Sequence, residues 1–578
     1  LMRYPSLPAV LLVSFSMTAW AGDPPTLILH HGKIATVDSE FSIAEAIAIR
    51  GERVLAVGTN EEITSLANDS TQVINLQGKT VLPGLIDSHV HPTGASVFEF
   101  DHPIPEMETI ADVLSYVKSR ADALDDGEWI RLSQVFITRL RDQRFPTRHE
   151  LDAVAPKNPV YFRTGPDAAL NSLALELNGI DKDFQIPEGE SGRVERDPQT
   201  GEPTGIIRSA GRYIKTSSRE SSPNQEQKQD LLRDLLQAYN AAGITSIADR
   251  NGSSGGVELY ESLLNRGELT CRVFVSRGVN AGSNLEVIEK QIQEIASHPR
   301  HESNRHLWIR GVKIFLDGGM LTGSAYMRQP WGVSEIYGIS DPEYRGLRYV
   351  EPEKLYRIAK MALENDLQMT AHSVGDGAVQ SLVDAYARID ENDFKVREHR
   401  PCVTHCNFMT PEAIETMSRL GIVADLQPAW LWLDGKTLLR QFGNDRMRYF
   451  QPYRTLFSKE IKVGGGSDHM QKIGKRRSVN PYDPFLAMWI AITREPRGMD
   501  TAIHPEEAIS REQAIRLYTI NNAWLTFEEH EKGSLEPGKL ADLIVVDRDP
   551  LTCPLEDLAD TQVLQTYLGG KLVHERAE

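Results

Sequence analysis

Cysteine is scarce in this sequence, and long runs of one residue type are absent. The chain has 578 residues but only four cysteines, which excludes a disulfide-stapled scaffold. No run of five or more like charges occurs and the net charge is −18, so there is no basic stripe for nucleic acid. Apolar residues make up 40% and charged residues 25%, as in ordinary globular proteins, which excludes wholesale disorder and a multi-span membrane protein.

Residues 1–21 have the pattern of a bacterial-type signal peptide. Arg3 precedes a short apolar stretch that ends in Ala19-Trp20-Ala21. That stretch is too short for a membrane-spanning helix, and a small-residue pattern of this kind is typical of a cleavage site. We therefore expect a periplasmic or secreted protein with no stable membrane span after cleavage. An uncleaved membrane anchor is the alternative.

Both ends of the remaining chain contain β-like segments. Short apolar runs with turn signals fill residues 26–76, and further runs follow at 541–547 and 563–573. The pattern predicts one small β-sandwich domain, built from residues 22–80 together with 525–578.

Between these ends, strand-like runs alternate with helical stretches, as a (β/α)8 TIM barrel requires. The predicted strands are Thr80–His91, Gly243–Asp249, Thr270–Arg277, Ile309–Asp317, Leu367–His372, Arg400–His405, Gly421–Gln427 and Ile461–Asp468. The prediction is thus an α/β fold with a barrel over residues 81–524. The long gap between the first two strands predicts an insertion over about residues 95–235, placed at the barrel mouth.

Several predicted strands end in residues that bind metals. The C-terminal ends of parallel barrel strands converge on one face, where active sites are built. His89 and His91 end the first strand, and residues i and i+2 of a strand point to the same side, so both imidazoles can share one ion. The alternative is that His89 and His91 are two surface histidines whose hydrogen bonds are satisfied without a metal.

Three further candidates lie at matching strand ends. His372 and His405 would each be ordinary core or surface histidines if they stood alone, but their shared position favours metal binding. Asp468 follows three glycines, which allow close backbone approach, and it is our candidate catalytic residue rather than a simple turn aspartate.

Lys313 lies inside the apolar strand Gly311-Val-Lys-Ile-Phe-Leu316, where a bare ammonium is costly. Carbamylation by carbon dioxide would turn it into an anion that can bridge two cations. An ion pair with Asp317 or another carboxylate is the alternative. Cys402 and Cys406 flank His405 without zinc-finger spacing, so we expect them to pack in the core, and the sequence does not decide whether they pair.

The combination of motifs resembles the metal-dependent amidohydrolase superfamily. Pro83-Gly-Leu-Ile-Asp-Ser-His-Val-His91 and the tail Gly533-Ser-Leu-Glu-Pro-Gly-Lys-Leu-Ala-Asp-Leu-Ile-Val-Val-Asp547 are similar to its opening and closing signatures. The stretches Val312-Lys-Ile-Phe-Leu-Asp-Gly318, Thr370-Ala-His-Ser-Val-Gly375 and Gly466-Ser-Asp468 resemble its amidohydrolase 3 branch, which holds N-substituted formamide deformylase-like enzymes. The resemblance covers nearly the whole chain after residue 21.

The resemblance implies a centre of two divalent metal ions. His89, His91 and Asp468 would hold one ion, His372 and His405 the other, and carbamylated Lys313 would bridge them. Nitrogen and oxygen ligands of this kind fit zinc best. The loop at 318–326 and the stretch 165–172 depart from the family pattern where substrate would be gripped, so the family's substrates do not transfer.

These residues predict a hydrolase that cleaves a non-peptide carbon–nitrogen bond, of amide or formamide type, in a small molecule with a metal-activated hydroxide. Ester or lactone hydrolysis on the same centre and a non-catalytic binding or regulatory protein are the alternatives. Tyr326, Trp430 and Trp432 are candidate substrate-binding residues. The sequence leaves open whether the chain forms a homo-oligomer.

Overall fold

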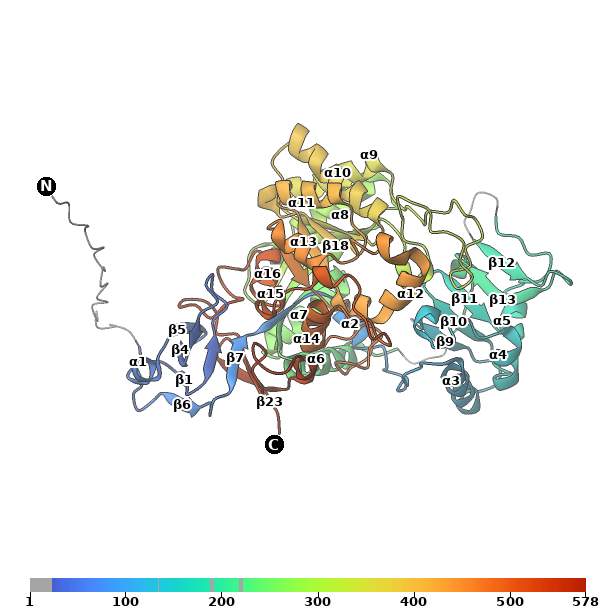
Figure 1. The fold of residues 1–578 in the computed structure, drawn as a ribbon. Helices are drawn as coiled ribbons and strands as arrows, with labels where there is room; N and C mark the ends of the chain where they lie inside the picture. Colours follow the sequence, from blue (N-terminus) through green and yellow to red (C-terminus); the bar gives the residue numbers. More distant parts are fainter. Residues whose placement is uncertain (1–22, 134, 188–191, 218–221, 578) are drawn as a thin grey trace.

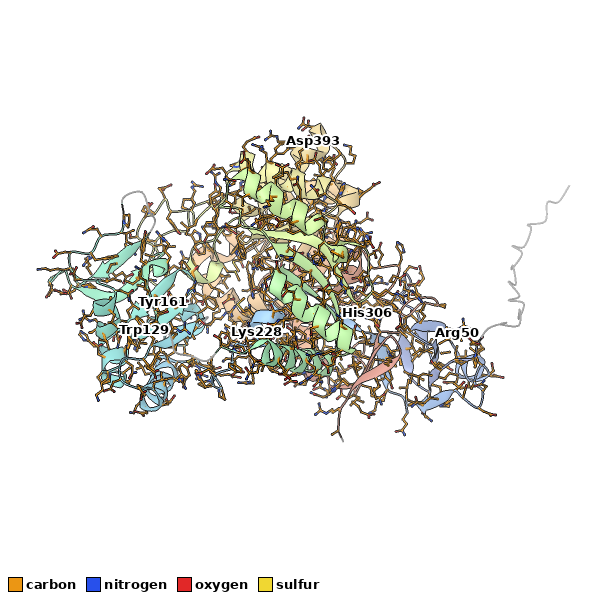
Figure 2. All side chains as sticks on the ribbon, turned by 180° about the vertical axis from the view of Figure 1, so that it is seen from behind. Arg50, Trp129, Tyr161, Lys228, His306 and Asp393 are labelled. Atoms are coloured by element: carbon orange, nitrogen blue, oxygen red, sulfur yellow. The ribbon has the colours of Figure 1, made fainter. Side chains whose placement is uncertain are left out.

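The computed structural model describes residues 23–133, 135–187, 192–217 and 222–577, so the predicted signal peptide lies outside the described residues. A central barrel lies between a terminal β domain on one side and the insertion on the other (Figure 1). Figure 2 shows the same arrangement from behind, with Trp129 and Tyr161 in the insertion and Arg50 at the opposite end. No helix of the described ranges is both long and apolar enough to cross a bilayer.

The barrel is a parallel sheet of eight strands in the order β20-β19-β18-β17-β16-β15-β14-β8. Its strands are β8 (Leu85–Val90), β14 (Ile244–Gly252), β15 (Arg272–Gly278), β16 (Leu307–Phe315), β17 (Gln368–Ser373), β18 (Cys402–His405), β19 (Val423–Leu426) and β20 (Val463–Gly465). Every residue of β8, β18, β19 and β20 is buried, as expected for strands covered on both faces. The predicted (β/α)8 barrel is confirmed.

Helices cover the outside of this sheet. They are α2 (Pro92–Ala95), α6 (Gln225–Ala241), α7 (Ser254–Arg266), α8 (Leu285–Ala296), α9 (Pro352–Glu364), α10 (Asp376–Asn392), α11 (Pro411–Leu420), α12 (Pro428–Arg446), α13 (Tyr453–Ser458), α14 (Pro484–Thr493), α15 (Arg511–Leu517) and α16 (Ile520–Leu525). In α9, Pro352 occupies the first turn, and Leu355, Ile358, Ala359 and Ala362 form one buried stripe at helical spacing. This stripe packs the helix against the barrel core.

Hydrogen bonds at the C-terminal ends of the first and last strands close the barrel. The Asp468 N–H donates to the His89 carbonyl oxygen at 2.8 Å, and the His91 N–H donates to the His469 carbonyl oxygen at 2.8 Å. The Asn522 side chain donates to the carbonyl oxygens of Ile86 and Gly465, at 2.5 and 2.8 Å. The first and last barrel strands, β8 and β20, are therefore held next to each other at the C-terminal face.

Strands from both termini build two further sheets. The first has the order β5-β4-β1-β6 and the second the order β23-β22-β21-β7-β2-β3. Their strands are β1 (Leu27–His30), β2 (Lys33–Ala35), β3 (Ile43–Ala44), β4 (Ala46–Arg50), β5 (Arg53–Gly58), β6 (Gln72–Asn75), β7 (Thr80–Pro83), β21 (Leu543–Val546), β22 (Val563–Leu568) and β23 (Lys571–Glu575), with helix α1 (Asn60–Thr64) beside them. A shared core that includes Ile34, Ile47 and Leu543 lies between the sheets, as predicted for a β-sandwich.

One predicted strand is in fact two. The run Thr80–His91 divides at Gly84: β7 pairs with β2 and β21 in the terminal sheet, whereas β8 begins the barrel. A Cβ at Gly84 would lie 2.2 Å from the Thr245 hydroxyl oxygen, so the chain can pass from one sheet to the other here only without a side chain. Apolar periodicity does not reveal this division, because both strands are buried.

The insertion after β8 has its own sheet, in the order β12-β13-β11-β10-β9. Its elements are α3 (Ile110–Ala123), β9 (Ile130–Ser133), α4 (Arg148–Val154), β10 (Val160–Thr164), β11 (Asp167–Leu170), α5 (Ser172–Leu177), β12 (Arg193–Arg196) and β13 (Pro203–Arg208). Short 3-10 turns are η1 (Ile137–Arg139) and η2 (Gly211–Tyr213) within it, and η3 (Pro299–His301), η4 (Met320–Thr322), η5 (Arg397–His399), η6 (Pro505–Glu507) and η7 (Leu555–Asp560) elsewhere. The insertion has a hydrophobic core of its own between its sheet and its helices.

A buried ion pair joins the barrel to the terminal β domain. The Arg272 guanidinium on β15 donates to both Asp542 carboxylate oxygens, at 2.7 and 2.8 Å. Burial would raise the pKa of Asp542, but Arg272 and the hydrogen bonds hold that pKa below its ordinary value. The pair therefore stabilises the fold above the unfolded carboxyl pKa of about 3.9, and this contribution is lost as the pH falls through the lower folded value.

We predict that Arg272→Ala lowers the free energy of unfolding by about 3–5 kcal/mol at pH 7, because it leaves a buried carboxylate without its partner. Urea unfolding measures this. The control is Arg305→Ala, which removes a half-exposed pair with Glu52 and should cost less than about 1 kcal/mol. Equal losses in the two variants would contradict the role given to Arg272.

Candidate metal centre

Three of the predicted ligands form a tight cluster where the first and last strands meet. His89 Nε2 and His91 Nε2 lie 3.3 Å apart, and Asp468 Oδ1 lies 3.3 and 3.2 Å from them. One ligand atom from each residue lies within 4.8 Å of the others, which is close enough for one ion. The cluster comes from chain segments about 380 residues apart, as the barrel closure requires.

The other two histidines continue the cluster across the barrel mouth. The His89 and His405 rings stack with centroids 4.9 Å apart, and the His405 and His372 rings meet edge to face at 4.6 Å. His405 and Asp468 both have positive φ, at 73° and 55°, a strained conformation that is typical of functional sites when the residue is not glycine. All four histidines and Asp468 thus converge on one face of the barrel.

Hydrogen bonds fix which ring nitrogen three of the four histidines offer. His89 Nδ1 donates to Asp425 Oδ2 at 3.2 Å, and His405 Nδ1 donates to Gln427 Oε1 at 2.7 Å, which leaves Nε2 of both rings for a metal. His372 Nε2 donates to the Gly318 carbonyl oxygen at 3.3 Å, so its Nδ1 is the free atom.

Burial keeps these imidazoles neutral, which is the form that binds a metal. Desolvation, followed by the charge of Lys313, lowers the pKa of His372 to about 3 and that of His89 well below the ordinary value. Desolvation and the neighbouring His372 have the same effect on the pKa of His405. His89, His372 and His405 are therefore available as neutral donors for a divalent cation at neutral pH.

Lys313 is 1% exposed, and burial lowers its pKa to about 8. No carboxylate oxygen of the described residues lies within ion-pair distance of its Nζ. Asp317 instead accepts backbone N–H groups from Tyr326, Val374 and Gly375, at 2.9–3.0 Å. The alternative ion pair between Lys313 and Asp317 is therefore not formed.

The supporting acceptors Asp425 and Gln427 were missed in the sequence. Both lie at the end of the seventh barrel strand, two residues apart and fully buried. Asp425 also accepts from the Ser88 hydroxyl at 2.5 Å, and burial raises its pKa to about 6. Asp425 and Gln427 have the same i, i+2 spacing at the end of a predicted strand as His89 and His91. That spacing in the sequence would have identified them as candidate site residues.

The aromatic candidates have different surroundings. The Trp430 ring stacks on His405 at 4.7 Å and is 5% exposed, and Trp432 lines a cavity of about 150 Å³ between the insertion and the barrel. Tyr326 packs against Gly377 and under the Arg348 guanidinium. Cys402 and Cys406 are buried free thiols, so the predicted core packing is confirmed and they do not pair.

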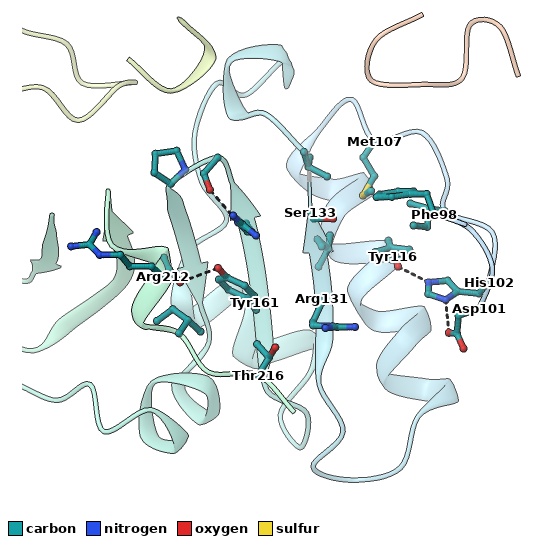
Figure 3. Close-up of a pocket in the computed structure, with 18 of the residues that line it drawn as sticks. Phe98, Asp101, His102, Met107, Tyr116, Arg131, Ser133, Tyr161, Arg212 and Thr216 are labelled. Carbon is teal, nitrogen blue, oxygen red and sulfur yellow. Dashed lines mark hydrogen bonds and ion pairs between the residues drawn. The ribbon is translucent and has the colours of Figure 1, made fainter. Parts of the chain in front are cut away.

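A second, larger cavity lies in the insertion. It measures about 720 Å³ and is lined by the 98–107 loop, β9, β10 and the segment 209–216 (Figure 3). In the close-up, Phe98, Tyr116 and Tyr161 surround it, and a hydrogen bond of 2.6 Å joins His102 to Tyr116. None of the six predicted centre residues lines this cavity.

Comparison with known proteins identifies the family of this chain. A model described as "Amidohydrolase family" matches residues 72–574. The chain belongs to the amidohydrolase family. Its fold and histidine cluster agree with this, and the protein is a metal-dependent hydrolase of carbon–nitrogen bonds.

Individual relatives are distant but similar along their whole length. The N-substituted formamide deformylase of Arthrobacter pascens is 28% identical, with 95% of this chain and 98% of the relative covered. The protein LONG AFTER FAR-RED 3 of Arabidopsis thaliana is also 28% identical, over 97% and 93%. The structure of an uncharacterised metal-dependent hydrolase from Pyrococcus furiosus has a TM-score of 0.65 at 22% identity, covering 91% of this chain and 100% of that one.

We predict that Asp425→Asn weakens divalent metal binding about 10- to 100-fold, because the amide holds His89 less firmly in the orientation and tautomer that a metal needs. Competition with a chromogenic chelator measures this. Asp542→Asn is the matched control, since it removes a buried carboxylate of the terminal β domain, next to β21, and circular dichroism first confirms that both variants are folded. An unchanged metal affinity in Asp425→Asn would show that the His89–Asp425 contact does not support the centre.

Proposed function

We propose that the protein hydrolyses a small-molecule carbon–nitrogen bond of the amide or formamide type at the cluster of His89, His91, His372, His405 and Asp468. The observation that carries this proposal is the convergence of four imidazoles and one carboxylate at the C-terminal face of the barrel, where burial keeps His89, His372 and His405 neutral. The similarity to an N-substituted formamide deformylase over almost the whole chain supports the same bond type.

The residues divide into two ligand groups in this proposal. His89, His91 and Asp468 would hold one divalent ion, and His372 and His405 would hold the other. Histidine nitrogens with one carboxylate fit zinc. When bound, the ions lower the pKa of a water molecule and so supply hydroxide near neutral pH.

Lys313 completes the donor set by carbamylation. A neutral amine adds to the carbon of carbon dioxide and loses one proton, which leaves an anionic carbamate between the two ligand groups. Burial supports this step, because it lowers the pKa of Lys313 to about 8 and makes the neutral amine accessible.

Asp468 moves the proton. Its carboxylate accepts a proton from the attacking water and returns it to the leaving nitrogen, so it acts first as base and then as acid. The Asp468 backbone is fixed at the barrel mouth by its hydrogen bond to the His89 carbonyl oxygen, and Oδ1 faces His89 Nε2 and His91 Nε2 at 3.3 and 3.2 Å.

We predict that Asp468→Asn retains much of the bound metal but loses about 10²-fold or more in kcat, because the amide cannot carry the proton. The assay is a panel of N-substituted formamides and amides, together with esters and lactones of the same acyl groups. Activity confined to the esters or lactones would replace the proposed bond type. Full activity of the variant would remove Asp468 from this role.

We further predict that the wild-type protein binds about two divalent ions per chain and that Lys313→Ala binds fewer, because a bridged pair loses its shared ligand. Elemental analysis of both proteins, reconstituted with zinc and bicarbonate, measures this. Lys290→Ala, on the exposed face of α8, is the control and should match the wild type. One ion in both proteins would make Lys313 a structural lysine.

A further inference from the structure

The carboxylate of Asp468 is held on its second oxygen by Asn480. Whereas Oδ1 faces His89 and His91, Oδ2 accepts from Asn480 Nδ2 at 3.1 Å. The same Nδ2 group donates to the Asp468 carbonyl oxygen at 2.8 Å. One amide thus holds both the side chain and the backbone of a residue whose φ of 55° is strained.

Asn480 is in turn held by an arginine from the insertion. Arg139 Nη1 donates to Asn480 Oδ1 at 3.2 Å and to the Val479 carbonyl oxygen at 2.6 Å. Because the amide oxygen accepts from Arg139, the amide nitrogen must face Asp468, so the guanidinium fixes the orientation of the amide.

The guanidinium itself is fixed on the barrel. Arg139 Nε and Nη2 donate to the two carboxylate oxygens of Asp434 on α12, at 2.8 and 2.7 Å. The Arg139 side chain is 8% exposed and the Asp434 side chain 2%, so this planar, two-point contact is largely shielded from water. Gln143, a few residues farther along the insertion, donates to the Thr437 hydroxyl of the same helix at 2.9 Å.

We propose that Arg139 and Asn480 are positioning residues that act through Asp468, so that the insertion contributes to the competence of the metal centre by docking on α12. This inference rests on the role proposed for Asp468. An arginine that served only to attach the insertion would need its contact with Asp434 alone. Arg139 also contacts Val479 and Asn480. These additional contacts connect the surface where the insertion docks on α12 to Asp468.

The test combines Arg139→Ala, Asn480→Ala and the double variant. We expect each single variant to lose about 10-fold or more in kcat, because a small misplacement of a reacting group is costly, while KM changes by less than about 3-fold. The double variant should lose no more than the worse single variant, since Arg139 acts through Asn480. Fully additive losses, or wild-type kcat in either single variant, would overturn the proposal.

A second readout does not depend on turnover. In the cobalt-substituted protein, the visible absorption spectrum reports the ligand geometry, and we expect the same spectral change in both single variants. The control is Arg144→Ala, which removes a two-point pair with Glu150 in the same insertion, with distances of 2.8 Å, but has no contact with Asn480. It should keep the wild-type spectrum and kcat. A wild-type spectrum in Arg139→Ala or Asn480→Ala would also overturn the proposal.

Arg139→Lys covers the case in which Arg139→Ala does not fold. Lysine keeps a positive charge opposite Asp434 but lacks the planar fork that reaches Asp434 and Asn480 together. We expect a folded protein, with a cooperative thermal unfolding transition, that shows the spectral change and lowered kcat; wild-type kcat and spectrum would count against the positioning role. If the wild type hydrolyses no member of the substrate panel, the proposed function fails, and the cobalt spectra still decide whether Arg139 and Asn480 position Asp468.

Discussion

The hydrogen bonds between β8 and the segment after β20 are the contacts on which the site depends. They join the Asp468 N–H to the His89 carbonyl oxygen and the His91 N–H to the His469 carbonyl oxygen, each at 2.8 Å. Without them the last strand would be an open sheet edge, and Asp468 would not reach the two histidines of the first strand. Barrel closure and assembly of the ligand cluster are therefore one structural event, stabilised by the Asn522 side chain that bridges both strands.

The same burial that stabilises the barrel prepares its chemistry. Desolvation disfavours charge on His89, His372 and His405, and the nearby lysine adds to this effect for His89 and His372. Each of these rings then finds one acceptor, which selects the nitrogen left for a ligand. Neutral form and orientation are thus set by the protein, so a cation would not need to displace protons from these rings.

Local sequence patterns predicted the barrel and much of the candidate cluster, because strand alternation places residues i and i+2 on one side. That logic applied to His89 and His91, and it would have extended to Asp425 and Gln427 had the polar residues of the seventh strand been considered together. The division at Gly84 was not predictable, since two buried strands in succession have one continuous apolar pattern. The contact of Arg139 with Asn480 spans 341 residues and depends on how the insertion docks, which no local pattern encodes.

The shared sheet of the two termini has a consequence for the order of folding during synthesis. β7 lies between β2, made early, and β21, made only after the whole barrel sequence. The edge of β7 that pairs with β21 must remain unpaired until about residue 546 has left the ribosome. β8, which carries His89, begins two residues after β7. Contacts between such distant segments form slowly because of their loop-closure entropy. The strand that carries His89 therefore follows a sheet position that is completed only by the C-terminal end of the chain.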